Sequence, residues 1–440
     1  MNSNTHKTTN PQAEALNRQI GAEAPAVLGM LSARGREIYF PKLGILSQSA
    51  EAAGKEINAT IGIALEEDGS PMMLPCISAN CLLKASETGS YAPSPGNPAI
   101  RKAWQESLLR KNPSLAGKRF SLPVVTSALT HGLSMSAYLF CDPGDELIMP
   151  DLYWENYDLL FSSAFGARPA TYPLFSNGKF NLAGLEKKLA AGAPSKKIVC
   201  LNFPNNPTGY TPDIEEAAAI AGVLIKAAAS GSRLAVIIDD AYFGLVYEEN
   251  IFRESMFGLL CNAHPNLLAI KLDGPTKEDY VWGFRIGFMT FGAGGGTPGV
   301  YAALEAKAAG AIRGSISNAS NISQSLLIKA YATGSYAAEK ERKYEILRAR
   351  YREVKRILAA RPEYAGRFEA LPFNSGYFMC LKMRSADPER LRRILLEKYS
   401  SGVIVMNNMV RVAFSSTPLA KLPVLFENIY RAAGEAAGKQ

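Results

Sequence analysis

Hydrophobic and polar residues along the middle of the chain follow a pattern that predicts strands separated by helices. Between about residues 120 and 295, short apolar runs recur at Glu146–Met149, Ile198–Leu201, Leu234–Ile238, Leu267–Ile270 and Ile286–Met289. The alanine-rich stretch from about Ile214 to Ala229 has the composition of a helix between two of these runs. The alternation is typical of βαβ units and predicts an α/β fold with a mainly parallel sheet flanked by helices.

The pattern changes after about residue 330, where long charged helical stretches begin. Strand-like runs at Gly376–Cys380 and Met409–Ala413 enclose a further helical stretch over Pro388–Tyr399. We therefore expect a second, smaller α+β domain. The predicted organisation is a flexible lead-in over 1–24, a small domain from 25–75 and 331–440, and a large domain over 76–330.

The most basic part of the chain, Glu341 to Arg361, raises the question of nucleic-acid binding. Its apolar residues follow a 3, 4, 3, 4 spacing at Tyr344, Leu347, Tyr351, Val354 and Leu358. That spacing predicts an amphipathic helix with one buried stripe and with its charges facing water. The prediction favours a solvated helix face over a nucleic-acid site.

Composition narrows the possible chemistry. The 440 residues include 48 Lys and Arg, 40 Asp and Glu, only three His and six Cys, for a net charge of +8. Few residues are thus available for a His-based triad, and with no Cys-x-x-Cys pair we expect no metal site and reduced core thiols. The first residues are polar and no run of 18 apolar residues occurs, so we expect a cytoplasmic protein without a membrane span.

Polar residues cluster where three predicted strands end. Asn205 and Asn206 follow the first strand, Asp239 and Asp240 with Tyr242 follow the second, and Thr276 and Lys277 follow the third, with Arg285 eight residues after the lysine. Taken singly, these are an ordinary turn, a helix cap and a surface lysine. Together they meet the needs of a pyridine aldehyde phosphate: an amine for an imine, an anion for the ring nitrogen, donors for the phenolate and cations for the phosphate.

With these motifs in this order, the sequence resembles the fold-type I pyridoxal-phosphate aminotransferases of class I/II, the group that includes aspartate aminotransferase. The resemblance covers roughly residues 40 to 430. Its strongest element is Lys277 followed by Gly283, Arg285 and Gly287. The resemblance implies that Lys277 forms the imine with pyridoxal 5′-phosphate and moves a proton at the substrate's Cα. Lys271 is the alternative lysine, but it lacks the downstream arginine spacing.

The resemblance also implies a cofactor site. Asp239, rather than Asp240, would face the pyridine nitrogen, and Tyr242 and Asn206 would bind the phenolic oxygen. The phosphate would be held by the residues Thr276, Arg285 and Thr130 and by the backbone N–H groups of Ala128 and Leu129. Trp154 would stack on the ring, with Tyr153 as the alternative. Tyr91 resembles the tyrosine that reaches the phosphate of a neighbouring subunit, which implies a homodimer with shared sites.

Three residues are implied for the substrate. Arg411 would clamp the α-carboxylate, and Gly62 would let the backbone approach. Arg313 resembles the arginine that binds a distal carboxylate across the dimer, which favours aspartate and glutamate; helix capping or phosphate binding is its alternative role. Two positions depart from the family pattern, namely Gly274 in place of a serine and Ala128 in place of a glycine.

The sequence thus predicts an aminotransferase that moves an amino group between an amino acid and a 2-oxo acid. Two alternatives stay open: a pyridoxal-phosphate-dependent lyase or decarboxylase, and a non-catalytic domain that senses a cofactor or effector. The expected partners are small molecules, with neither nucleic acid nor membrane.

Overall fold

A seven-stranded sheet forms the centre of the computed structural model, which describes residues 10–41, 44–192, 194–406 and 408–437. The strand order is β2 (Val124–Thr126), β10 (Gly287–Ala293), β9 (Leu267–Asp273), β8 (Arg233–Asp239), β7 (Lys196–Asn202), β3 (Glu146–Pro150) and β4 (Arg168–Tyr172). Only β10 runs antiparallel to its neighbours. The predicted mainly parallel sheet is therefore confirmed.

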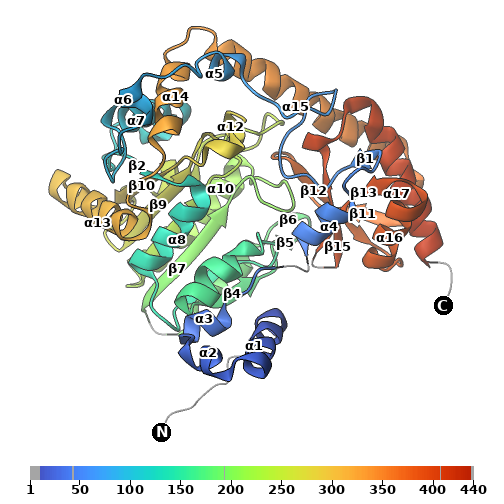
Figure 1. Cartoon of the computed structure of the whole chain (residues 1–440), viewed down its shortest axis with the longest axis horizontal. Helices are drawn as coiled ribbons and strands as arrows, with labels where there is room; N and C mark the ends of the chain where they lie inside the picture. The colour runs from blue at the N-terminus through green and yellow to red at the C-terminus, as the bar shows by residue number, and fades with distance from the viewer. Residues whose placement is uncertain (1–9, 42–43, 193, 407, 438–440) are drawn as a thin grey trace.

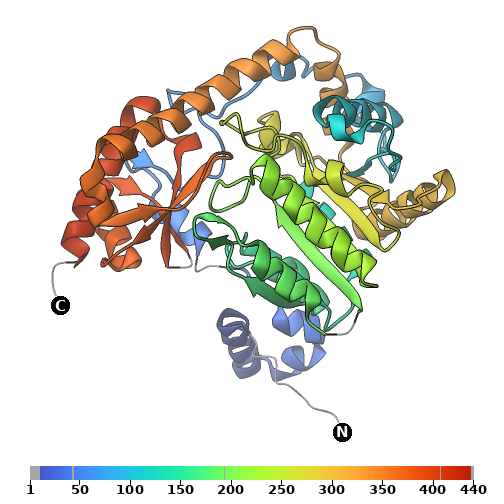
Figure 2. The same ribbon diagram turned by 180° about the vertical axis from the view of Figure 1, so that it is seen from behind.

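Helices cover both faces of this sheet, and the strands are apolar on both sides as a result. On β8, Val236 and Ile238 belong to one hydrophobic cluster, and Ala235 and Ile237 belong to the other. One face carries α8 (Ala128–Phe140) with α13 (Pro298–Ile316) beside it, as Figure 1 shows. The opposite face carries α9 (Leu182–Ala190) and α10 (Ile214–Ala229), which lie in front in Figure 2.

A smaller antiparallel sheet lies beside the central one. Its order is β11 (Phe368–Ala370), β12 (Phe378–Met383), β15 (Met409–Ala413) and β14 (Ile404–Met406), and α16 (Pro388–Lys398) and α17 (Leu422–Ala437) pack together nearby. Near the start of the chain, β1 (Ile57–Asn58) pairs in parallel with β13 (Ser401–Gly402). The smaller α+β unit thus draws on both ends of the chain, as expected. The domain boundaries given above stay predictions.

One long helix joins the two sheets. This helix, α15 (Tyr336–Ala360), runs from beside α14 (Asn321–Tyr331) to the smaller sheet (Figure 1). It buries Leu347, Tyr351 and Val354, which confirms the predicted apolar stripe. The expectation that its charges all face water is wrong for Arg350, which is fully buried because backbone carbonyls accept its N–H groups.

Part of the expected lead-in over 1–24 is helical, and its flexibility stays a prediction. Residues 1–9 of that segment lie outside the described residues, but Pro11–Glu23 form the helix α1. The Asn10 side chain accepts a hydrogen bond from the Gln12 N–H at 2.9 Å, and Pro11 occupies the first helical position. These are ordinary start signals of a helix. After α2 (Pro25–Met30) and α3 (Ala33–Glu37), α4 (Ile45–Glu51) reaches the site described next.

Among the described residues, none of the helices combines the length and apolarity that crossing a bilayer requires.

Candidate active site

A cavity of about 410 Å³ lies beyond the carboxyl ends of β7 and β8, where α8 and the turn after β9 meet. Ligands of open parallel sheets bind at this edge. The cavity brings together twelve residues that the sequence predicted for cofactor or substrate, drawn from both sheets and the loops between them: Gly62, Ala128, Leu129, Thr130, Trp154, Asn206, Asp239, Tyr242, Thr276, Lys277, Arg285 and Arg411.

Lys277 enters the cavity from α12 (Pro275–Glu278), a single helical turn after β9. Its Nζ lies 5.1 Å from the centroid of the Tyr242 ring. Burial lowers the pKa of the Lys277 amine to about 8; Asp239 opposes this effect and Arg285 adds to it. At pH 7 about a tenth of this amine is therefore uncharged, a few hundred times the fraction of an ordinary lysine, and the uncharged form is the one that a nucleophile or a base requires.

The alternative lysine, Lys271, lies in a different environment. It is fully buried within β9, where it forms ion pairs with Asp240 and, at 3.3 Å, with Asp273. Burial acts to lower the pKa of Lys271, but the two carboxylates outweigh it and raise the pKa above its ordinary value. Lys271 is thus a structural cation, and it does not line the cavity.

Asp239 is the last residue of β8, and its side chain lines the cavity. Its Oδ2 accepts a hydrogen bond from the Tyr157 hydroxyl at 2.5 Å, and its Oδ1 accepts one from the Ala241 N–H at 3.1 Å. Burial raises the pKa of Asp239, although the bond from Tyr157 lowers it. A positive ring nitrogen would compensate this buried carboxylate.

Asp240 faces away from the cavity because successive residues at a strand end point to opposite sides. Its carboxylate accepts a hydrogen bond from the Ser255 hydroxyl at 2.5 Å and pairs with Lys271. The choice of Asp239 over Asp240 therefore agrees with the direction in which each side chain points.

A turn at the start of α8 can hold a phosphate. Ala128 has φ 61°, in the left-handed region, and begins α8, whose first N–H groups have no partner within the helix. The backbone of Gly287 packs directly against this turn: a Cβ at Gly287 would lie 2.7 Å from the Ala128 carbonyl carbon. Thr276 and Arg285 line the same cavity.

Close packing also leaves no room for a side chain at position 274, where this chain has glycine instead of the serine of the family pattern. A Cβ on Gly274 would lie 2.9 Å from both the Gly287 Cα and the Ile286 carbonyl oxygen. Those atoms belong to backbone, which has little room to shift. The side chain of a serine does not fit there, so a phosphate in this cavity would have to be held by other donors.

Of Trp154 and Tyr153, the two candidates for ring stacking, only Trp154 lines the cavity of Lys277, and both line a neighbouring cavity. Trp154 lines the cavity and packs edge-on against Tyr157, with 5.8 Å between ring centroids. Tyr153 lines only a neighbouring cavity of about 460 Å³, where its hydroxyl donates to Asp158 at 3.1 Å. Of the two, Trp154 is therefore placed to meet a ring in the cavity.

Arg411 reaches the cavity from β15 in the smaller sheet. Its Nη1 donates to the Asn206 Oδ1 at 3.3 Å and its Nη2 to the Thr60 carbonyl at 3.5 Å. Its guanidinium carbon lies 4.2 Å from the centroid of the Phe378 ring. The buried Nε–H has no hydrogen-bond partner within the described part of the chain, so this arginine can still bind an anion.

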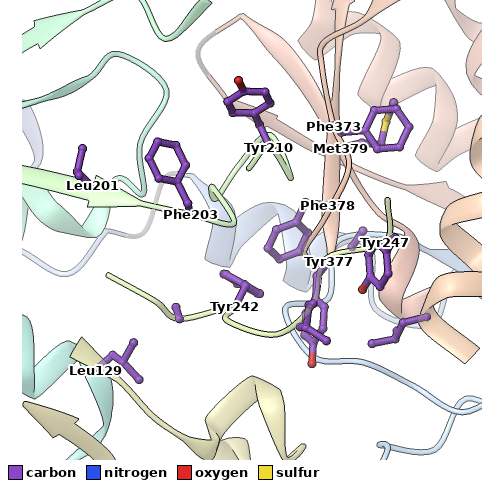
Figure 3. Packing of buried hydrophobic residues seen from close by; sticks show 14 of the residues in the cluster. Leu129, Leu201, Phe203, Tyr210, Tyr242, Tyr247, Phe373, Tyr377, Phe378 and Met379 are labelled. Carbon is purple, nitrogen blue, oxygen red and sulfur yellow. The ribbon is translucent and has the colours of Figure 1, made fainter. Parts of the chain in front are cut away.

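Tyr242 packs among aromatic side chains between the two sheets. The Tyr242 ring packs edge-on against Tyr377 and Phe378, at 5.2 and 5.7 Å between centroids. Figure 3 shows Tyr242 between Leu129 of α8 and these two residues at the start of β12. Burial raises the pKa of Tyr242, so its hydroxyl stays protonated and can donate a hydrogen bond.

Two residues that hold Asp239 through hydrogen bonds were among those that sequence reasoning did not find. Tyr157 binds Asp239, and its only local signal is an aromatic position three residues after Trp154. Asn202, at the end of β7, lines the cavity and accepts the Asn206 N–H at 2.8 Å, while its amide group donates to the Asp239 carbonyl at 2.9 Å. Asn202 thereby ties the ends of β7 and β8 together.

Tyr91 and Arg313 lie outside the cavity of their own chain. Tyr91 is 89 % exposed, and Arg313 is exposed near the end of α13. Both were predicted to act in the site of a neighbouring subunit, and these roles stay predictions.

The chain was compared with known proteins. The family model for "Aminotransferase class I and II" matches residues 56–429. An aspartate aminotransferase of Musicola paradisiaca is 28% identical over 202 residues, which are 45% of this chain and 47% of the relative. A probable N-acetyl-LL-diaminopimelate aminotransferase of Bacillus subtilis is 28% identical over 201 residues, 46% of this chain and 47% of that protein. The chain thus aligns with about half the length of these curated relatives.

Solved structures share the fold over a longer stretch. An aminotransferase from Anaerococcus prevotii superposes with a TM-score of 0.80 at 22% identity, over 93% of this chain and 100% of that one. An alanine aminotransferase from Pyrococcus furiosus superposes with a TM-score of 0.74 at 19% identity, over 92% of this chain and 100% of that one.

Proposed function

Because this chain belongs to the class I and II aminotransferases, we propose that it transfers an amino group between an amino acid and a 2-oxo acid. The cofactor of this family is pyridoxal 5′-phosphate. The observation that carries the proposal is the meeting of three groups in one cavity: the Lys277 amine with its lowered pKa, the buried Asp239 carboxylate and the Arg411 guanidinium with an unpaired N–H.

The residues around the cavity fit the cofactor. Asp239 would hold the pyridine nitrogen as a cation, and Tyr242 and Asn206 would donate to the phenolic oxygen. The residues Thr130, Thr276 and Arg285 and the N–H groups at the start of α8 would hold the phosphate, and Trp154 would cover the ring. When bound, the cofactor supplies an electron sink for negative charge at the substrate's Cα.

Lys277 and Arg411 act on the substrate from opposite sheets. Lys277 would attach the cofactor and later move the proton at Cα, and both tasks need the uncharged amine that burial favours. Arg411 would bind the α-carboxylate, which meets the open donor on its Nε and orients the Cα–H bond.

For the substrate, we propose aspartate, glutamate and their 2-oxo acids, with Arg313 of a second subunit binding the distal carboxylate. The resemblance around Arg313 supports this, and one relative is named an aspartate aminotransferase. The site would then be shared within a homodimer, and Tyr91 would also cross to the other subunit. We place the enzyme in the cytoplasm, since its buried cysteines lie among apolar residues as reduced thiols do.

Large apolar side chains exposed on two contacting segments, the one before Tyr91 and α14, support the homodimer. Leu82 is 91 % exposed and Ile322, on α14, is 45 % exposed. The two segments are held together, since Lys329 of α14 donates to the Leu82 carbonyl at 2.9 Å.

The test is a set of single turnovers on the purified protein with pyridoxal 5′-phosphate. We expect the wild type to bind the cofactor with a visible absorbance band, which Lys277→Ala removes without unfolding the chain. Amino acids should convert the bound aldehyde to the amine and yield the 2-oxo acid. Failure to bind the cofactor would overturn the proposal, and release of ammonia or carbon dioxide would replace it with lyase or decarboxylase chemistry.

The same assay tests the substrate class. Arg313→Leu should weaken the reaction with aspartate and glutamate but leave that with alanine unchanged. An unaltered preference would rule out the distal-carboxylate role.

A further inference from the structure

A buried charged cluster lies directly behind Lys277. The next two residues, Glu278 and Asp279, are 4 % and 0 % exposed. Lys340 of α15 pairs with Glu278 at 2.7 Å and with Asp279 at 3.0 Å, and Lys111 of α7 (Pro98–Lys111) also pairs with Glu278. Two carboxylates thus face two ammonium groups, so the cluster is balanced in charge.

Two phenols complete the hydrogen bonding of Asp279. Tyr331 of α14 donates to its Oδ2 at 2.8 Å, and Tyr336 of α15 donates to its Oδ1 at 2.7 Å. Burial acts to raise the pKa of Glu278, but Lys111 and Lys340 hold it well below its usual range. A buried network with every member satisfied is rigid, because any displacement leaves a charge unpaired in a low-dielectric interior.

This cluster is the main anchor of the turn that carries Lys277. Helix α12 has four residues, and a single turn of helix does not hold its own shape in water. Its position therefore depends on tertiary contacts. On one side these are the ion pairs of Glu278 and Asp279, and on another the Tyr377 hydroxyl, which donates to the Lys277 carbonyl at 3.0 Å.

Helix α15 connects this anchor with the smaller sheet. Ten residues after Lys340, Arg350 donates to the carbonyls of Leu65 at 2.8 Å and Ser415 at 2.5 Å. Ser415 follows the strand that carries Arg411 by only a few residues. Ten helical residues span about 15 Å. One rigid helix thus holds both the turn of Lys277 and the segment after Arg411 (Figure 2).

We propose that Lys340 and Tyr336 are positioning residues: by holding Asp279 and Glu278 from the start of α15, they fix where Lys277 presents its amine relative to Asp239 and Arg411. The inference rests on the proposed function for its catalytic meaning, but its structural part can be tested without turnover. It also explains the buried charges at positions 278 and 279, which do not line the cavity.

The test compares Lys340→Met with Lys355→Met in the full-length chain. Lys355 lies on the same helix, but its side chain is 44 % exposed and pairs with Glu248 at 3.3 Å, far along α15 from the cluster. Three measurements are made: hydrogen exchange of the backbone amides over 275–281 with and without cofactor, the visible circular dichroism of the bound cofactor, and kcat and KM separately.

We expect Lys340→Met to speed hydrogen exchange over 275–281 and to change the visible circular dichroism of the bound cofactor. It should also lower kcat about ten- to a hundredfold and leave KM within about twofold of the wild type, because the catalytic group is misplaced. Lys355→Met should match the wild type in all three. Lys340→Arg, which restores the cation, should recover at least part of kcat. Tyr336→Phe removes one hydroxyl and no charge, so it replaces Lys340→Met as the test variant if Lys340→Met does not fold.

Wild-type exchange and circular dichroism in both Lys340→Met and Tyr336→Phe would overturn the inference, even if the melting temperature falls. This failure is distinct from failure of the proposed function, which would appear as a wild type that does not bind the cofactor. The exchange measured without cofactor decides the positioning claim in either case.

Discussion

The Tyr157 hydroxyl donates a hydrogen bond of 2.5 Å to the Asp239 carboxylate, and both residues are buried. This bond counteracts the effect of burial, which raises the pKa of Asp239. A carboxylate that stays ionised is what a protonated pyridine nitrogen needs as its partner. In the proposed function, Tyr157 therefore supports cofactor binding through Asp239, although it does not line the cavity.

Tyr157→Phe should weaken cofactor binding. Removing the donor raises the pKa of Asp239 further, so less of the carboxylate is ionised to pair with the ring nitrogen. We expect an affinity loss of about tenfold or more, the usual effect of losing a hydrogen bond to a charged group. Titration of the apoprotein with pyridoxal 5′-phosphate measures it. Tyr153→Phe, whose hydroxyl binds Asp158 instead, should keep the wild-type affinity. Equal affinities for both variants would contradict the role.

The reaction of Lys277 with the cofactor should depend on pH with a midpoint near 8. Below the pKa of about 8 the amine is protonated and cannot attack an aldehyde, so the rate should rise about tenfold per pH unit and level off above it. Stopped-flow absorbance gives the rate, and Nα-acetyl-lysine, whose side-chain amine has an ordinary pKa of about 10.4, is measured in parallel. The ratio of the two rates should be constant below a pH of about 8 and fall about tenfold per pH unit above it. A rate that follows the free amine up to pH of about 10 would show that burial does not lower the pKa of Lys277.

Ala128→Gly should stabilise the protein. Ala128 has φ 61°, a conformation that costs an L-residue roughly 1–2 kcal/mol and a glycine almost nothing. The greater freedom of glycine in the unfolded chain offsets about half of this, which leaves a gain of a few tenths to about 1 kcal/mol in the free energy of unfolding. Urea denaturation measures it. Ala302→Gly, at an exposed position inside α13, should instead destabilise by about 1 kcal/mol. A change of the same sign in the free energy of unfolding for both variants would refute the explanation.

Gly274→Ser restores the residue of the family pattern but should damage the site. The new Cβ would meet the Gly287 Cα and the Ile286 carbonyl at 2.9 Å, which displaces the backbone beneath the phosphate turn. We expect a loss of about 1–3 kcal/mol in the free energy of unfolding, as for other overpacked sites, and weaker binding of pyridoxal 5′-phosphate. Gly222→Ser on α10, where a Cβ meets nothing within 4 Å, is the control and should be tolerated. Tighter cofactor binding by Gly274→Ser would disprove the packing argument.

Arg411→Lys should separate substrate binding from cofactor binding. A lysine keeps the charge but cannot offer a carboxylate two parallel N–H groups or bridge to Asn206 and Thr60. We expect KM for all amino acids to rise about tenfold to a hundredfold, the cost of a lost charged hydrogen bond, with cofactor affinity nearly unchanged. Steady-state kinetics with alanine and with aspartate test this. An effect on aspartate alone would mean that Arg411 binds the distal carboxylate instead.

Sequence reasoning found the strand ends and most residues of the cavity because these signals are local. Asp239, Lys277 and Arg285 each follow a strand or a turn at a short, fixed separation, and the carboxyl ends of parallel strands meet at one edge of the sheet. It was wrong about Arg350. The spacing of apolar residues shows which side of a helix meets the core, but it does not show that the backbone carbonyls of Leu65 and Ser415 lie there and accept hydrogen bonds from a buried arginine.

By itself, the sequence determined the alternation of strands and helices and the second α+β unit, and it predicted Lys277 as the lysine of the site, since all three depend on residues close together along the chain. Only the tertiary structure decided that Tyr157 binds Asp239 across 82 residues, that the Lys277 amine loses its charge more easily than an ordinary lysine, and that α15 anchors its turn. Burial and contacts between distant segments depend on how the helices and sheets pack, and no local pattern of residue types records that packing.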